Sequence, residues 1–108
     1  MLQSNKCKLK VDVYSNKMVL SSEGRILTAV PCEPFSSSRL LIGNLTEAKK
    51  CLEKAVQDFG AISFLKASPT ITIQPHEFIE GGLSEVEESL LSKVAYNAGA
   101  KEVRVVVA

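Results

Sequence analysis

The chain has 108 residues, enough for one domain but not two, so we expect residues 1–108 to form a single unit. Hydrophobic residues make up 45% of it and charged residues 23%, which is typical of a globular protein and argues against wholesale disorder. Thirteen basic residues against twelve acidic ones leave a net charge of +1. This balance gives no electrostatic reason to expect nucleic acid as a partner.

The sequence also argues against a membrane-spanning or secreted protein. No apolar run approaches the roughly 18 residues that a spanning helix needs, and the first ten residues lack the apolar centre of a signal peptide. Cys7, Cys32 and Cys51 are odd in number and far apart in the sequence, which suits a reducing cytosol better than a disulfide framework. With a single histidine beside these scattered cysteines, we expect a cytoplasmic protein without a metal site.

The first third of the chain predicts three antiparallel strands joined by tight turns. Apolar and polar residues alternate from Cys7 to Tyr14, as in a half-buried strand, and two shorter strands follow. The predicted strands span residues 7–14, 17–21 and 25–30. Pro31 and Pro34, with the serines after them, then predict a surface loop.

Two helices alternate with two more strands in the rest of the chain. Asn44 with Glu47 forms a predicted capping box for a helix that ends at Gly60. Ser84, with Glu87 at the third helical position, begins a second helix that stops at Gly99. The intervening strand is predicted at 70–74, and the last strand, at 102–107, has an apolar run that suits the interior of a sheet.

The resulting order, βββαβαβ, predicts an α/β fold with a mixed five-stranded sheet and helices packed on it. This order is the core of the ribonuclease H-like superfold, which includes polynucleotidyl transferases, resolvases and actin-like ATPases. Fold alone does not choose among these functions.

A nuclease of this class needs several carboxylates that converge on metal ions. Asp12 lies on the first predicted strand, and Glu47 or Glu53 lies on the first helix, but the strand at 70–74 carries no acidic residue. We therefore interpret Asp12 as a solvated partner of a neighbouring lysine. His76 and Glu77 resemble a general-base pair, but no nucleophile or second ligand has compatible spacing, so we expect a surface or loop-packing histidine.

The stretch from Leu65 to Val106 resembles the MreB family of bacterial actin homologues, the rod-shape-determining proteins. The similar segments are Ser68-Pro69, Pro75, Ser84-Glu85-Val86-Glu87, Ala98-Gly99-Ala100 and 103–107, with weaker similarity at Lys10-Val11-Asp12-Val13 and Ile42-Gly43-Asn44-Leu45. The resemblance covers nearly the whole chain but only the first subdomain of an actin fold. It implies an actin-like subdomain.

The departures from the family pattern affect its ATPase elements. The family's first phosphate loop reads Asp-x-Gly-Thr-x-Asn, whereas Asp12 is followed here by Val13-Tyr14-Ser15 with no glycine. The second phosphate loop and the adenosine-binding half have no counterpart in this sequence. We therefore expect neither ATP hydrolysis nor a bound cofactor, and only Asp12 and Lys17 are left as candidates for nucleotide binding.

The resemblance also implies two contact surfaces. Val86, with Glu87, falls where the family's helix packs across paired protofilaments, although Val86 could instead pack beneath the helix start. The second is a loop that in these filaments inserts into the membrane, although Phe64 or Leu65 could instead fold onto the sheet. Its residues are Ile62, Phe64, Leu65 and Lys66.

These observations together predict a non-catalytic interaction module of the bacterial cell-shape cytoskeleton. Its expected partner is a full-length MreB-like filament protein, with weak contact to the inner membrane face. The alternative is a remnant nucleotide-binding or hydrolase domain of the ribonuclease H-like superfold.

Overall fold

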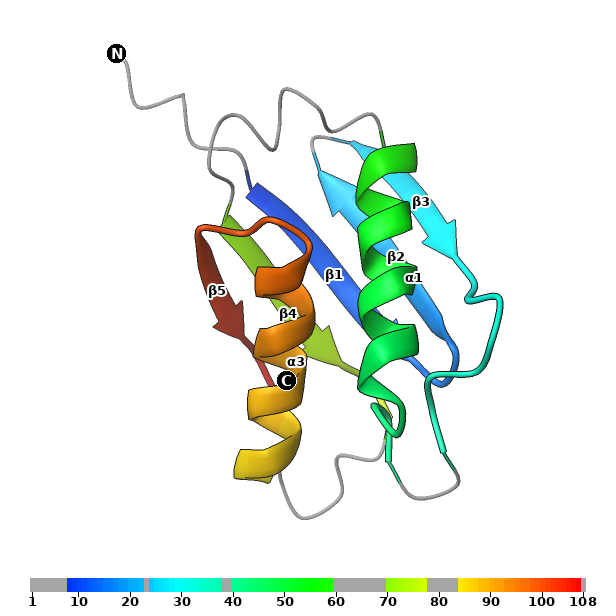
Figure 1. Cartoon of the computed structure of the whole chain (residues 1–108). Coiled ribbons are helices and arrows are strands. Elements are labelled where there is room, and N and C mark those ends of the chain that lie inside the picture. Colours follow the sequence, from blue (N-terminus) through cyan, green and yellow to red (C-terminus); the bar gives the residue numbers. More distant parts are fainter. Residues whose placement is uncertain (1–7, 23, 38–39, 60–69, 78–83, 108) are drawn as a thin grey trace.

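The computed structural model describes residues 8–22, 24–37, 40–59, 70–77 and 84–107. Five strands and two helices lie in these ranges, and the strands form one mixed sheet in the order β3-β2-β1-β4-β5 (Figure 1). The elements are β1 (Lys8–Tyr14), β2 (Lys17–Ser22), β3 (Arg25–Ala29), α1 (Leu45–Asp58), β4 (Thr70–Pro75), α3 (Glu85–Asn97) and β5 (Glu102–Val105). The predicted α/β class, with a mixed five-stranded sheet and helices packed on it, is confirmed.

β1 is the central strand and pairs antiparallel with β2 and parallel with β4. Its alternation is the predicted one, because Leu9, Val11 and Val13 are buried whereas Lys8 and Lys10 are exposed. Successive side chains of a strand point to opposite faces, so this pattern directs the apolar residues to one side of the sheet.

Both helices cover that apolar side of the sheet (Figure 1). α1 buries five residues of one face, and α3 packs on α1, β4 and β5. The buried face of α1 consists of Ala48, Cys51, Leu52, Ala55 and Val56. Asn44 and Ser84 cap the two helices as predicted, each accepting a hydrogen bond from the backbone N–H three residues later. Gly99, with φ 109°, follows the end of α3 as expected.

The last strand differs from its prediction. β5 lies at the edge of the sheet with β4 as its neighbour, not in the interior. Glu102 and Arg104 are exposed, Val103 and Val105 are half-buried, and the regular strand ends before Val106. An apolar run alone does not distinguish a central strand from an edge strand that is covered on one face only.

The segment after β3 is more buried than a surface loop. Phe35, Leu41 and Ile42 are all within the core. Asn16, in the β1–β2 turn at φ 52°, accepts hydrogen bonds at Oδ1 from the backbone N–H groups of Phe35 and Ser36, each at 2.8 Å. The turn and this segment therefore hold each other in place.

Candidate functional site

Most of the polar groups singled out in the sequence meet where β1 and β4 end. Asp12 lies opposite Gln74 in the parallel β1–β4 register, and His76 follows β4 directly. The Asp12 carboxylate lies 2.7 Å from His76 Nε2 and 3.5 Å from Lys10 Nζ. The predicted pairing of Asp12 with a neighbouring lysine is present, and the histidine is an additional partner that the sequence did not indicate.

The aromatic rings extend this cluster toward Lys17. The rings of Tyr14 and His76 stack with their centroids 4.7 Å apart and an interplanar angle of 10°. The Lys17 ammonium lies over the Tyr14 ring, 4.6 Å from its centroid, in a cation–π contact. Lys17 and Asp12, the two candidates for nucleotide binding, thus each contact a member of the Tyr14–His76 stack.

Glu77 is hydrogen-bonded to Ser15, whereas its sequence neighbour His76 contacts Asp12. Its carboxylate accepts hydrogen bonds from the backbone N–H of Ser15 at 2.8 Å and from the Ser15 hydroxyl at 2.9 Å. These bonds, the backbone one first, together with the positive charge of Lys17, lower the pKa of Glu77. His76 and Glu77 therefore do not form the general-base pair that their adjacency suggested.

This arrangement determines what the β1–β2 turn offers to a ligand. A phosphate loop binds its anion by presenting free backbone N–H groups. Here the Ser15 N–H already donates to the Glu77 carboxylate, and that negative charge would repel a phosphate. The turn is thus occupied by an anion from its own chain.

At the start of α3, the two residues expected on one contact surface lie in different environments. Val86 is 67% exposed, so it does not pack beneath the helix start. Glu87 is only 7% exposed and is not available on that surface. Its Oε1 accepts a hydrogen bond from the Leu41 N–H at 3.4 Å, while Oε2 is buried and has no hydrogen-bond partner among the described residues.

Other sequence-based expectations concern the membrane and metals. Ile62, Phe64, Leu65 and Lys66 lie outside the described residues. Within the described ranges, neither helix has the length and apolar character needed to cross a membrane. The same part of the chain contains no group of three or more His, Cys, Asp or Glu side chains placed to hold a metal ion.

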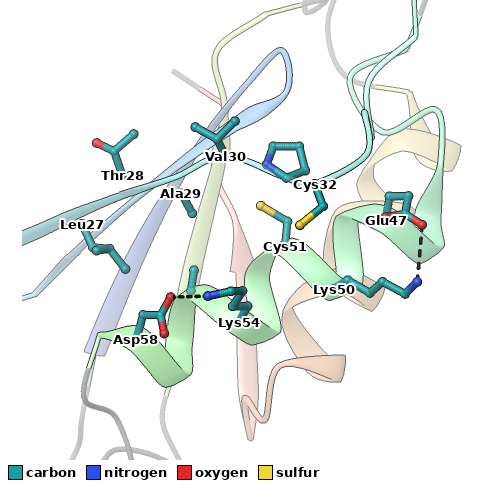
Figure 2. A pocket seen from close by; sticks show the side chains of 12 residues that line it. Leu27, Thr28, Ala29, Val30, Cys32, Glu47, Lys50, Cys51, Lys54 and Asp58 are labelled. Atoms are coloured by element: carbon teal, nitrogen blue, oxygen red, sulfur yellow. Dashed lines mark hydrogen bonds and ion pairs between the residues drawn. The ribbon is translucent and has the colours of Figure 1, made fainter.

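A pocket of about 250 Å³ lies between β3 and α1 (Figure 2). Cys32, just after β3, and Cys51, in α1, both line it, although they are far apart in the sequence. Cys32 is exposed and Cys51 is buried, as its place on the apolar helical face predicted. Burial and, second, the charge of Cys32 raise the pKa of the Cys51 thiol to about 11.

Charged side chains of α1 also line this pocket. Lys54 pairs with Asp58 at 3.0 Å and Lys50 pairs with Glu47 at 3.5 Å. This pocket could not be predicted from the sequence, because it depends on how β3 packs against α1.

The chain matches no protein-family model and no curated protein.

Proposed function

We propose that this protein is a non-catalytic, actin-subdomain-like interaction module that binds a full-length MreB-like filament protein at the cytoplasmic face of a bacterial envelope. Its element order βββαβαβ and strand order β3-β2-β1-β4-β5 are consistent with the ribonuclease H-like superfold. The observation that carries the non-catalytic part of the proposal is the occupation of the Ser15 N–H by Glu77.

The non-catalytic part follows from what phosphoryl transfer requires. Catalysis of that reaction depends on donors and a metal that position the nucleotide phosphates. In the β1–β2 turn the Ser15 N–H and hydroxyl donate to Glu77, and the Lys17 ammonium lies over the Tyr14 ring. Asp12, the remaining acidic group, is held by His76 and Lys10. Each group that would serve a nucleotide is thus engaged within the chain.

The binding part rests on the exposed start of α3. Val86 is an apolar side chain, 67% exposed, between exposed Glu85 and buried Glu87. Glu88, in the same first turn, is also exposed. An exposed valine flanked by carboxylates suits a partner surface with an apolar depression and basic residues at its rim.

Co-sedimentation with polymerised MreB tests the proposal. The Val86→Glu variant should remain in the supernatant at filament concentrations that pellet the unaltered protein. Ile26→Glu is the matched control, because Ile26 is 73% exposed on β3 and receives the same change in charge and size. If the unaltered protein does not pellet with filaments, the proposed function is wrong; if Val86→Glu pellets as well as Ile26→Glu, Val86 is not the contact.

The alternative, a remnant nucleotide-binding domain, is favoured by one observation. Asp12 and His76 lie near the carboxyl ends of the parallel strands β1 and β4, where open α/β sheets bind their ligands. Titration with ATP and Mg²⁺, followed by amide chemical shifts, separates the two functions. Saturable shifts at Ser15 and Lys17 would support nucleotide binding, whereas no shifts at millimolar ligand would support the interaction module.

A further inference from the structure

Cys32 and Cys51 bring two thiols from separate elements to one pocket. Cys32 belongs to the segment that follows β3, and Cys51 lies near the middle of α1. Figure 2 shows both sulfur atoms at the same end of the pocket, and the charge of Cys32 acts on Cys51. The two cysteines therefore line one pocket in the folded protein, although nothing in their sequence spacing indicates this.

The two thiols differ in access to solvent. Cys32 is exposed, so a small oxidant reaches it directly, whereas Cys51 is only 7% exposed. Lys54 also lines the pocket, and its ammonium is paired with Asp58 at 3.0 Å. Oxidation by peroxides begins at a solvent-accessible thiol, and a neighbouring thiol can then convert the sulfenic acid to a disulfide.

We propose that Cys32 and Cys51 form a peroxide-sensitive dithiol that closes reversibly to a disulfide between the β3–α1 segment and α1. Disulfides in a reducing compartment are usually transient and redox-sensing, so this proposal is compatible with a cytoplasmic location. It does not depend on filament binding.

The chemistry proceeds in two steps with a hydroperoxide as the oxidant. The Cys32 thiolate attacks one peroxide oxygen; an S–O bond forms, the O–O bond breaks, and the leaving hydroxide takes up a proton to give water. The Cys51 sulfur then attacks the Cys32 sulfenic acid, so that an S–S bond forms as the S–O bond breaks. The thiol proton and the departing hydroxide give a second water. In total, the two thiols lose two electrons and two protons, and hydrogen peroxide is reduced to two molecules of water.

The burial of Cys51 gives the second step a kinetic signature. Burial keeps the pKa of the Cys51 thiol above its usual range, so only a small fraction of Cys51 is thiolate at neutral pH. Where this step limits the rate, disulfide formation should accelerate as pH rises from about 7 to about 9.

The experiment uses the Cys7→Ser protein, which removes the third thiol. After treatment with stoichiometric hydrogen peroxide, intact mass measured without reductant should fall by about 2 Da, the mass of two hydrogen atoms. Proteolysis should release a cross-linked peptide pair containing Cys32 and Cys51, and dithiothreitol should restore the original mass.

Two further variants assign the roles of the two thiols. Cys7→Ser/Cys51→Ala should accumulate a sulfenic acid at Cys32 that dimedone traps, because no resolving thiol is present. Cys7→Ser/Cys32→Ala should remain unmodified under the same treatment. Circular dichroism confirms that each variant is folded, and Cys51→Val replaces Cys51→Ala if the latter is not. The proposal is overturned if the Cys7→Ser protein gains oxygen at Cys32 without losing 2 Da, if Cys51 is oxidised first, or if the disulfide forms only between molecules.

Discussion

Asn16 connects the β1–β2 turn to the segment before α1, so its replacement should reveal how tightly that turn is held. Its Oδ1 accepts the N–H groups of Phe35 and Ser36 at 2.8 Å each, and its own N–H donates to the Ser36 hydroxyl at 3.0 Å. Its backbone has a φ of 52°, in the left-handed region that asparagine tolerates better than alanine.

Three substitutions separate these contributions. Asn16→Gly removes the acceptor from two part-buried N–H groups, at about 1 kcal/mol each, so the free energy of unfolding should fall by about 2 kcal/mol. Asn16→Ala loses the same acceptor and adds left-handed strain, for a fall of about 3 kcal/mol. Asn16→Asp keeps an oxygen acceptor and tolerates the backbone, so we expect a change below about 0.5 kcal/mol.

Urea unfolding at neutral pH, followed by far-ultraviolet circular dichroism, measures all three variants on one scale. The reasoning fails if Asn16→Asp is destabilised as much as Asn16→Gly, because the acceptor oxygen then does not hold the turn. It fails equally if glycine and alanine have the same effect, since the left-handed backbone would then cost alanine nothing.

Three other predictions concern titration and packing. Glu77 has a pKa lowered from 4.5 by its bonds to Ser15, so its contribution to stability is present above pH 4.5 and is lost as pH falls through the folded-state pKa. Acid unfolding of Glu77→Gln should accordingly show a shallower loss of stability below pH 4.5 than the unaltered protein. Cys51 has a pKa raised from 9.0 to about 11, so the unfolded chain loses this proton first and stability should fall as pH rises from 9.0 toward 11. Urea midpoints across this interval should fall less steeply for Cys51→Ala, and equal slopes would contradict the burial of the thiol. Gly43→Ala would bring a Cβ to 2.7 Å from Ser37 Cβ. The resulting overpacking should lower the free energy of unfolding by about 1–3 kcal/mol. Thermal melting measures this loss, with Asn44→Gly as the control for loss of the helix cap.

The features predicted correctly from the sequence depend on local patterns. The alternation around Val11 is visible without tertiary information, because a strand's side chains have a period of two. Asn44 and Ser84 were recognisable as caps because their residue types favour the position before the first helical turn. The capping boxes were only half right, because the Asn44 N–H donates to the Phe35 carbonyl and the Glu87 carboxylate accepts from Leu41 instead of turning back to Ser84.

The features that were missed depend on register and packing between distant segments. Asp12 meets His76 only because β1 and β4 pair in parallel with Asp12 opposite Gln74. Cys32 and Cys51 line the same pocket only because β3 packs against α1. A side chain's own neighbours in the sequence contain no information about such a register, so these partners could not be predicted from spacing.

The segment between β3 and α1 links the regions on which both proposals depend. Its residue Phe35 donates to Asn16 in the β1–β2 turn and accepts from Gly43 and Asn44 at the start of α1. Its residue Leu41 donates to Glu87, which directly follows Val86. Since Glu87 is anchored inside, Val86 is held outward. The same buried contact removes the glutamate from the proposed binding surface and orients the valine on it. The exposed valine is thus positioned by the fold itself and does not require a bound nucleotide to be presented.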